Sequence, residues 1–137
     1  MEDSENESEN YLKDRKSFTL VGRAKSDSVL RQKDGADTLG DRIVFANPIY
    51  DESNQVLLGR DQGQFVLVDP EKMIYEGNFT VILDAGTLCT QGAASNSAAT
   101  TLAVTGGTGI FIGARGEVTL RPRNDQGTEF DVIYSLE

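Results

Sequence analysis

The sequence contains no histidine and no tryptophan, and Cys89 is the single cysteine among its 137 residues. Without histidine there can be no Ser-His-Asp or Cys-His catalytic arrangement, no histidine-bound metal and no side chain whose ordinary pKa lies near 7. A single cysteine excludes a disulfide within the chain and a zinc site built from several cysteines. We therefore expect neither a metal nor a cofactor, and most hydrolase and metalloenzyme classes are set aside.

Basic side chains are also scarce, since 13 Lys and Arg stand against 22 Asp and Glu, for a net charge of −9. Binding to phosphates needs clustered Lys and Arg, so nucleic acid is not an expected partner. No apolar run approaches the roughly 20 residues of a membrane span, and the first apolar cluster, residues 18–21, is too short and too late for a secretory signal. These absences predict a soluble, cytoplasmic protein that does not bind membranes.

The acidic residues are concentrated at the start of the chain. Residues 1–10 carry five carboxylates and no apolar residue after Met1, a composition that favours disorder. We predict that residues 1–16 form a disordered or lid-like segment, in which Tyr11–Lys16 either cap the mouth of a cavity or belong to a solvated tail. Residues 17–137 are predicted to form a single domain, because this length supports one hydrophobic core.

From Phe18 onward the apolar residues alternate with a period of two, which is typical of β-strands. In the last segment, for example, Val132 and Tyr134 share one face while Asp131 and Ser135 share the other. No stretch sustains a helical period for three turns. The strands predicted in this way cover residues 18–23, 42–50, 64–68, 75–83, 88–93, 101–104, 116–121 and 130–137.

About eight short strands with few helices predict an all-β fold, an eight-stranded antiparallel β-barrel with a central apolar cavity. Such a barrel has room for packed side chains or for one small ligand. Apolar residues occupy both faces of some strands, as in Ile43–Ala46. We therefore expect one face to line the interior and the other to pack against a second subunit, as in a homodimer or homotrimer.

The glycine-rich segment Ala103–Gly116 is similar at first sight to the phosphate-binding turn of dinucleotide-binding proteins. The third glycine of that turn would have to fall at Ile112, and only 21 residues follow Gly116. Those residues are too few for the rest of a nucleotide-binding fold. The pattern instead favours a tight corner between two strands of the barrel.

Asn47 is the clearest polar candidate, because it shares a strand face with Ile43 and Phe45. A carboxamide on an apolar face must find a partner or lose about 1–3 kcal/mol. It either binds the backbone at the strand end or points into a cavity and holds a ligand carbonyl or a water molecule. Tyr75 and Gln91 are further polar candidates, with structural roles as the alternative.

The segment Leu102–Leu120, LAVTGGTGIFIGARGEVTL, closely resembles the corresponding stretch of allene oxide cyclases and, less closely, that of plant dirigent proteins. The resemblance covers about residues 38–121 and includes Thr38–Asp41 and Thr90–Gly92. It implies an eight-stranded antiparallel barrel with an apolar internal pocket, usually assembled into oligomers. That implication agrees with the alternation of the strands.

The resemblance also implies roles for individual residues. Phe45 matches an aromatic residue of the pocket wall and Asn47 a water-binding asparagine. Tyr75 stands where the cyclases have a pocket phenylalanine, Phe65 where they have a pocket cysteine, and Ala94 where they have a pocket tyrosine. The cyclases carry a glutamate on the first strand that polarises the substrate, whereas the first predicted strand of this chain has no carboxylate.

The segment Phe45–Asp51, followed by Gly59 and Gly63–Phe65, is similar to bacterial spirotetronate cyclases, which fold a linear polyketide for an intramolecular [4+2] closure. A pericyclic closure moves no proton, so it needs neither histidine nor the missing glutamate. It needs an apolar cavity that removes chain entropy, an effect worth up to about 7–11 kcal/mol. The sequence therefore predicts a cofactor-independent cyclase of natural product biosynthesis that acts on an apolar polyene or polyketide.

Two other functions stay open, namely a dirigent-like protein that binds an apolar ligand without catalysis and an oxylipin (allene oxide) cyclase. In each case the cavity would use the same two groups of residues. The predicted hydrogen-bonding and catalytic side chains are Asn47, Tyr75 and Gln91, and the predicted substrate-binding side chains are Ile43, Phe45, Phe65, Leu67 and Phe79.

Overall fold

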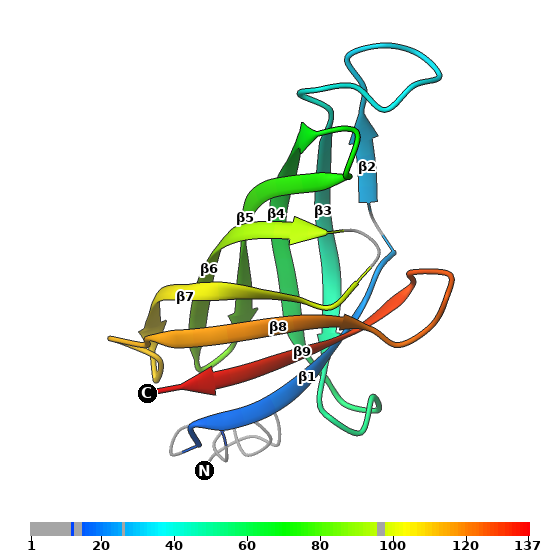
Figure 1. Cartoon of the computed structure of the whole chain (residues 1–137). Helices are drawn as coiled ribbons and strands as arrows, with labels where there is room; N and C mark the ends of the chain where they lie inside the picture. Colours follow the sequence, from blue (N-terminus) through cyan, green and yellow to red (C-terminus); the bar gives the residue numbers. More distant parts are fainter. Residues whose placement is uncertain (1–11, 13–14, 26, 96–97) are drawn as a thin grey trace.

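The computed structural model describes residue 12 and residues 15–25, 27–95 and 98–137, and every regular element in these ranges is a β-strand (Figure 1). No helix of this described part is long and apolar enough to cross a membrane. The strands are β1 (Ser17–Arg23), β2 (Asp27–Leu30), β3 (Arg42–Tyr50), β4 (Leu57–Asp69), β5 (Ile74–Leu83), β6 (Gly86–Ser95), β7 (Thr100–Gly109), β8 (Gly116–Pro122) and β9 (Glu129–Leu136).

The strands form one antiparallel sheet in the order β1-β9-β8-β7-β6-β5-β4-β3-β2. β1 also pairs with β3, with Val21 opposite Tyr50 and Gly22 opposite Ile49, and this pairing closes the sheet. The predicted eight-stranded antiparallel barrel is therefore confirmed, with β2 as one additional strand. β2 pairs with the first residues of β3, and β1 pairs with the last residues of β3. The two strands therefore lie end to end along the same edge of β3.

Several strands are longer than predicted, and β4 and β7 exceed the prediction by the most. β4 begins at Leu57 rather than at residue 64, and β7 continues to Gly109 rather than ending at residue 104. In both places glycine and polar residues interrupt the apolar alternation, but the backbone still pairs with the neighbouring strands. The predicted corner in the glycine-rich segment consequently starts later, because Gly106 and Gly107 belong to β7 and the turn covers residues 110–113.

Buried side chains fill one end of the barrel, where β1 begins and β9 ends. Phe18 stacks on Tyr134 with 5.0 Å between the ring centroids and lies 6.2 Å from the ring of Phe111. Leu12, which is 1% exposed, joins this cluster from the residues before β1. The core therefore closes the interior of the barrel at this end.

Candidate functional site

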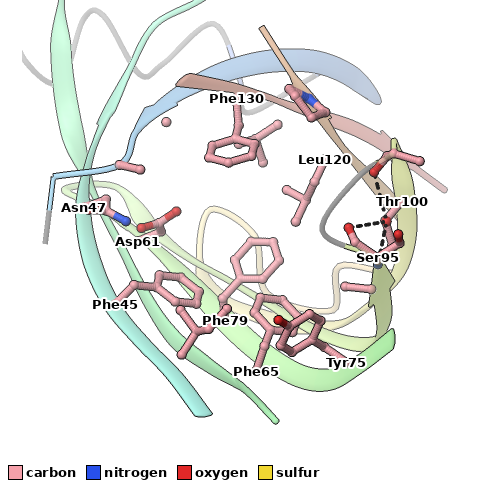
Figure 2. Close-up of a pocket in the computed structure, with 17 residues that line it drawn as sticks. Phe45, Asn47, Asp61, Phe65, Tyr75, Phe79, Ser95, Thr100, Leu120 and Phe130 are labelled. Carbon is pink, nitrogen blue, oxygen red and sulfur yellow. Dashed lines mark hydrogen bonds between the residues drawn. The ribbon is translucent and has the colours of Figure 1, made fainter. Parts of the chain in front are cut away.

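The end of the barrel opposite the core holds a cavity of about 200 Å³. A cavity for a single water molecule needs only about 10–15 Å³, so an organic ligand has room here. All eight barrel strands contribute to the wall (Figure 2). The lining residues are Gly22, Ala24, Ile43, Phe45, Asn47, Asp61, Phe65, Tyr75, Phe79, Ala94, Ser95, Ala98, Thr100, Leu120, Pro122, Phe130 and Val132.

Aromatic rings dominate one side of this cavity. Phe45 and Phe65 stack with 5.8 Å between their centroids. Their positions depend on glycines in the facing strands, since Phe45 lies opposite Gly63 and Phe65 lies opposite Gly77. Gly63 also lies opposite Phe79, and a Cβ atom on Gly63 would come within 2.7 Å of that residue's own Cβ atom. The rings occupy space that the glycines leave empty, as in aromatic–glycine pairs of other sheets.

Two polar residues face each other across β3 and β4. Asn47 and Asp61 are partners in the ladder, and both line the cavity (Figure 2). The backbone N–H of Lys25 donates a 2.7 Å hydrogen bond to Asn47 Oδ1. Lys25 lies between β1 and β2, so the Asn47 side chain holds the point where the chain passes from one strand to the next. Of the two predicted roles of Asn47, the structure shows the bond to the backbone.

Replacing Asn47 with Ala is therefore expected to lower the free energy of unfolding by about 1 kcal/mol, because the Lys25 N–H loses its acceptor. Urea denaturation of the purified variant measures this change. Asn78→Ala is the matched control, since Asn78 is exposed on β5 and should change the stability by less than about 0.5 kcal/mol. Equal stabilities of the Asn47→Ala variant and the parent protein would contradict a structural role.

Tyr75 lies at the start of β5, where it lines the cavity, and it is 8% exposed. Burial, followed by the nearby carboxylates of Asp37 and Asp41, raises the pKa of the Tyr75 phenol, and Arg31 opposes this effect. Asp41 is held in the loop between β2 and β3 by backbone N–H groups of Gln32 and Thr38, at 2.6 and 3.0 Å. The phenol is thus protonated at neutral pH and can donate a hydrogen bond to a ligand.

A second phenol lies deeper in the barrel. Tyr134 is fully buried beside Thr90, and burial, followed by the charge of Asp61, raises the pKa of the Tyr134 phenol. It therefore stays neutral. Asp61 lines the cavity, and its Oδ1 atom is shielded from solvent.

Six of the eight predicted site residues meet in the cavity wall. Leu67 is buried but outside the wall, where its backbone N–H and carbonyl bond the loop at Asp41 and Gly40. Gln91 is exposed, because it alternates with Thr90, which is 2% exposed and points inward. The structure therefore does not bring Gln91 to the cavity. The six predicted residues that lie in the wall are Ile43, Phe45, Asn47, Phe65, Tyr75 and Phe79.

The sequence prediction missed Asp61, Leu120 and Phe130, which also line the cavity. Asp61 was missed because the predicted strand began at residue 64, which left Asp61 outside it. Because β4 starts at Leu57, Asp61 belongs to the strand and falls on the same face as Phe65, which lies four residues further along the chain. The signal was therefore the period of two, extended backward through Gly63.

The predicted lid would place Tyr11–Lys16 over the mouth of this cavity. Leu12, Arg15 and Lys16 lie instead at the core end of the barrel, where Lys16 Nζ donates a 2.8 Å hydrogen bond to the carbonyl of Glu137. β1 starts beside them and runs toward the cavity end, so these three residues do not cap the mouth. Residues 1–11 and 13–14 lie outside the described residues.

The chain belongs to the allene oxide cyclase family, whose model matches residues 9–124. Among solved structures, a pyocyanin demethylase shares the fold with a TM-score of 0.74 and 21% identity, over 85% of this chain and 97% of the demethylase. A pterocarpan synthase dirigent protein matches with a TM-score of 0.72 and 19% identity, over 88% and 91% of the two chains. The Diels-Alderase AbmU from Streptomyces koyangensis matches with a TM-score of 0.67 and 13% identity, over 94% and 71%.

Proposed function

We propose that this protein is a cyclase that folds a linear polyene or polyketide inside the barrel for an intramolecular ring closure of the [4+2] type. The observation that carries the proposal is the cavity itself, which is lined by five aromatic rings and few polar groups and is closed at its base by the core. A flexible apolar chain loses its conformational freedom on entering such a space. The family membership and the fold shared with a Diels-Alderase support this proposal.

Ring closure in this cavity would depend mainly on shape. Holding the two reacting ends together removes an entropy cost of up to about 7–11 kcal/mol, with no proton transfer. Tyr75 would donate a hydrogen bond to a carbonyl of the substrate. This bond polarises the carbonyl, so the alkene conjugated to it accepts electrons more readily in the closure. In this proposal the protein uses neither a metal nor a cofactor.

Replacing Tyr75 with Phe is expected to lower the rate of ring closure about 10- to 100-fold while the substrate affinity changes less than about threefold. The reason is that only the hydroxyl is removed and the apolar ring remains. Single-turnover measurements give the rate, and equilibrium titration gives the affinity. Tyr50→Phe is the control, because the Tyr50 ring lies under the guanidinium of Arg23 and does not line the cavity.

The test of the proposed function is direct. The purified protein is incubated with a panel of linear trienes that carry an activated alkene, and the cyclisation rate and product stereochemistry are compared with those in buffer. Faster closure and one favoured stereoisomer are expected. Rates equal to those in buffer across the panel, although the compounds bind, would contradict a cyclase.

A non-catalytic, dirigent-like binder is the alternative that the geometry supports next. Of the three hydrogen-bonding residues predicted, Gln91 lies outside the cavity and Asn47 bonds the backbone of Lys25. Tyr75 is then the main donor left for catalysis. For a binder, Tyr75→Phe would alter the affinity for the ligand but not the rate at which the ligand reacts. The protein would then change the product distribution of a reactive ligand without changing its reaction rate.

Allene oxide cyclisation is a third candidate, favoured by one observation. The carboxylate that the first strand lacks is present on β4, as Asp61 in the cavity wall. Incubation with an allene oxide tests this function through the enantiomeric composition of the cyclopentenone product. A racemic product at the rate found in buffer would remove this candidate.

A further inference from the structure

One charged side chain lies in the mostly apolar wall of the cavity. Among its described lining residues, Asp61 is the acidic side chain and no lysine or arginine is present (Figure 2). Asp61 Oδ1 is shielded from solvent. A shielded carboxylate in apolar surroundings repels an anion and attracts a cation more strongly than it would in water.

The aromatic rings favour the same ligand charge. Phe45 and Phe65 on β3 and β4, Phe79 on β5 and Phe130 on β9 surround the space beside Asp61 (Figure 2). The face of an aromatic ring carries negative electrostatic potential and attracts organic cations, and cages of such rings bind quaternary ammonium groups. A ligand with positive charge therefore gains from the walls as well as from the carboxylate.

The wider electrostatic field has the same sign. The carboxylates of Asp37 and Asp41 act on Tyr75 from the loop between β2 and β3, although Arg31 offsets part of their effect. Of the net charge of −9, residues 1–10 carry −5, so the rest of the chain keeps a net charge of −4. A cation is therefore attracted toward the protein before it reaches the cavity, and an anion is repelled.

We propose that the cavity selects a mostly apolar polyene that carries a delocalised positive charge, such as a conjugated iminium, seated between Asp61 and the aromatic rings. This inference deepens the proposed function, since it takes the same cavity as the substrate site. Delocalised charge matters because such a cation is weakly hydrated and loses little on leaving water. A compound with an acidic headgroup placed against Asp61 is excluded.

Three probes with the same three-ring frame test this inference: N-methylacridinium, neutral acridine and acridine-9-carboxylate. Binding to the full chain is measured by fluorescence titration and calorimetry at a pH where acridine is neutral. We expect the cation to bind at least about tenfold more tightly than acridine, and the carboxylate at least about tenfold more weakly. Acridine or its carboxylate binding as tightly as the cation would overturn the proposal.

The variant Asp61→Asn keeps the shape of the side chain and removes its charge. We expect the preference for the cation to fall to within about threefold, with the affinity for acridine nearly unchanged. Glu76→Gln is the control, because it removes the same charge from an exposed position on β5 and should leave the preference intact. A preference that survives Asp61→Asn, or that Glu76→Gln removes equally, would contradict the role of Asp61.

The ranking of the three probes on the parent protein is decisive even where Asp61→Asn does not fold. Because the ranking is measured by binding alone, it is independent of the ring-closure assay. Preferred binding of the cation with no acceleration of any closure would refute the proposed cyclase and leave this inference standing. Accelerated closure of neutral trienes with no preference for the cation would support the proposed cyclase and overturn this inference.

Discussion

Replacing Ala94 with Trp is expected to weaken binding of acridine and of any cyclisation substrate about 10- to 100-fold and to remove the acceleration of ring closure. Ala94 lines the cavity and lies opposite Tyr75 in the ladder between β5 and β6. An indole ring from this position enters the space that a ligand would use. A ligand would have to displace a buried aromatic side chain at a cost of about 1.5–3 kcal/mol, which corresponds to about 10- to 100-fold in affinity.

Ala93→Trp provides the matched control, since Ala93 is the adjacent residue on β6 and is exposed on the outer face. This variant should bind acridine like the parent protein. Far-ultraviolet circular dichroism and size-exclusion chromatography show whether both variants keep the fold and the assembly state. Unchanged affinity in a folded Ala94→Trp variant would show that the ligand binds elsewhere.

Replacing Gly107 with Ala is expected to lower the free energy of unfolding by about 3 kcal/mol. Gly107 lies on β7, where a Cβ atom would come within 2.5 Å of the Phe111 carbonyl oxygen and 2.7 Å of the Thr87 carbonyl oxygen. Both atoms belong to backbone and cannot rotate away. The strands would have to separate locally, which disturbs the turn at residues 110–113 and the packing of Phe111 in the core.

The neighbouring residue supplies the comparison for this measurement. A Cβ atom on Gly106 would meet no atom within 4 Å, so Gly106→Ala should change the stability by less than about 0.5 kcal/mol or increase it slightly. Urea denaturation of both variants measures the difference. Similar losses for the two substitutions would indicate that backbone flexibility, rather than contact with the Thr87 and Phe111 carbonyls, explains why glycine is needed.

The barrel could be predicted from the sequence because one face of each strand is buried. In β9, Val132 and Tyr134 are at most 2% exposed, as the alternation indicates. The prediction was less accurate where pairing, not burial, holds a strand. The start of β4 around Gly59 and the end of β7 around Gly107 form ladders through backbone atoms, which leave no apolar pattern in the side chains.

The candidate site, like the strands, was predictable where the apolar alternation marks the buried face of a strand. Phe45, Phe65 and Phe79 could be placed in the wall because they share the inward face of adjacent strands. Asp61 was missed and Gln91 was misplaced for related reasons. One belongs to a stretch of strand that was not predicted, and the other lies one position away from the buried Thr90, so a shift of one residue reverses its direction.

The sequence by itself determined that the chain forms a β-barrel with an apolar interior, because a period of two in hydrophobicity is a local property of each strand. Only the tertiary structure decided which end of the interior is filled. Phe18, Phe111 and Tyr134 come together from distant parts of the chain to close one end, and Phe45 and Phe65 pack over glycines of the facing strands in the wall of the cavity at the other. Contacts between residues so far apart depend on strand register and closure, which no single segment specifies.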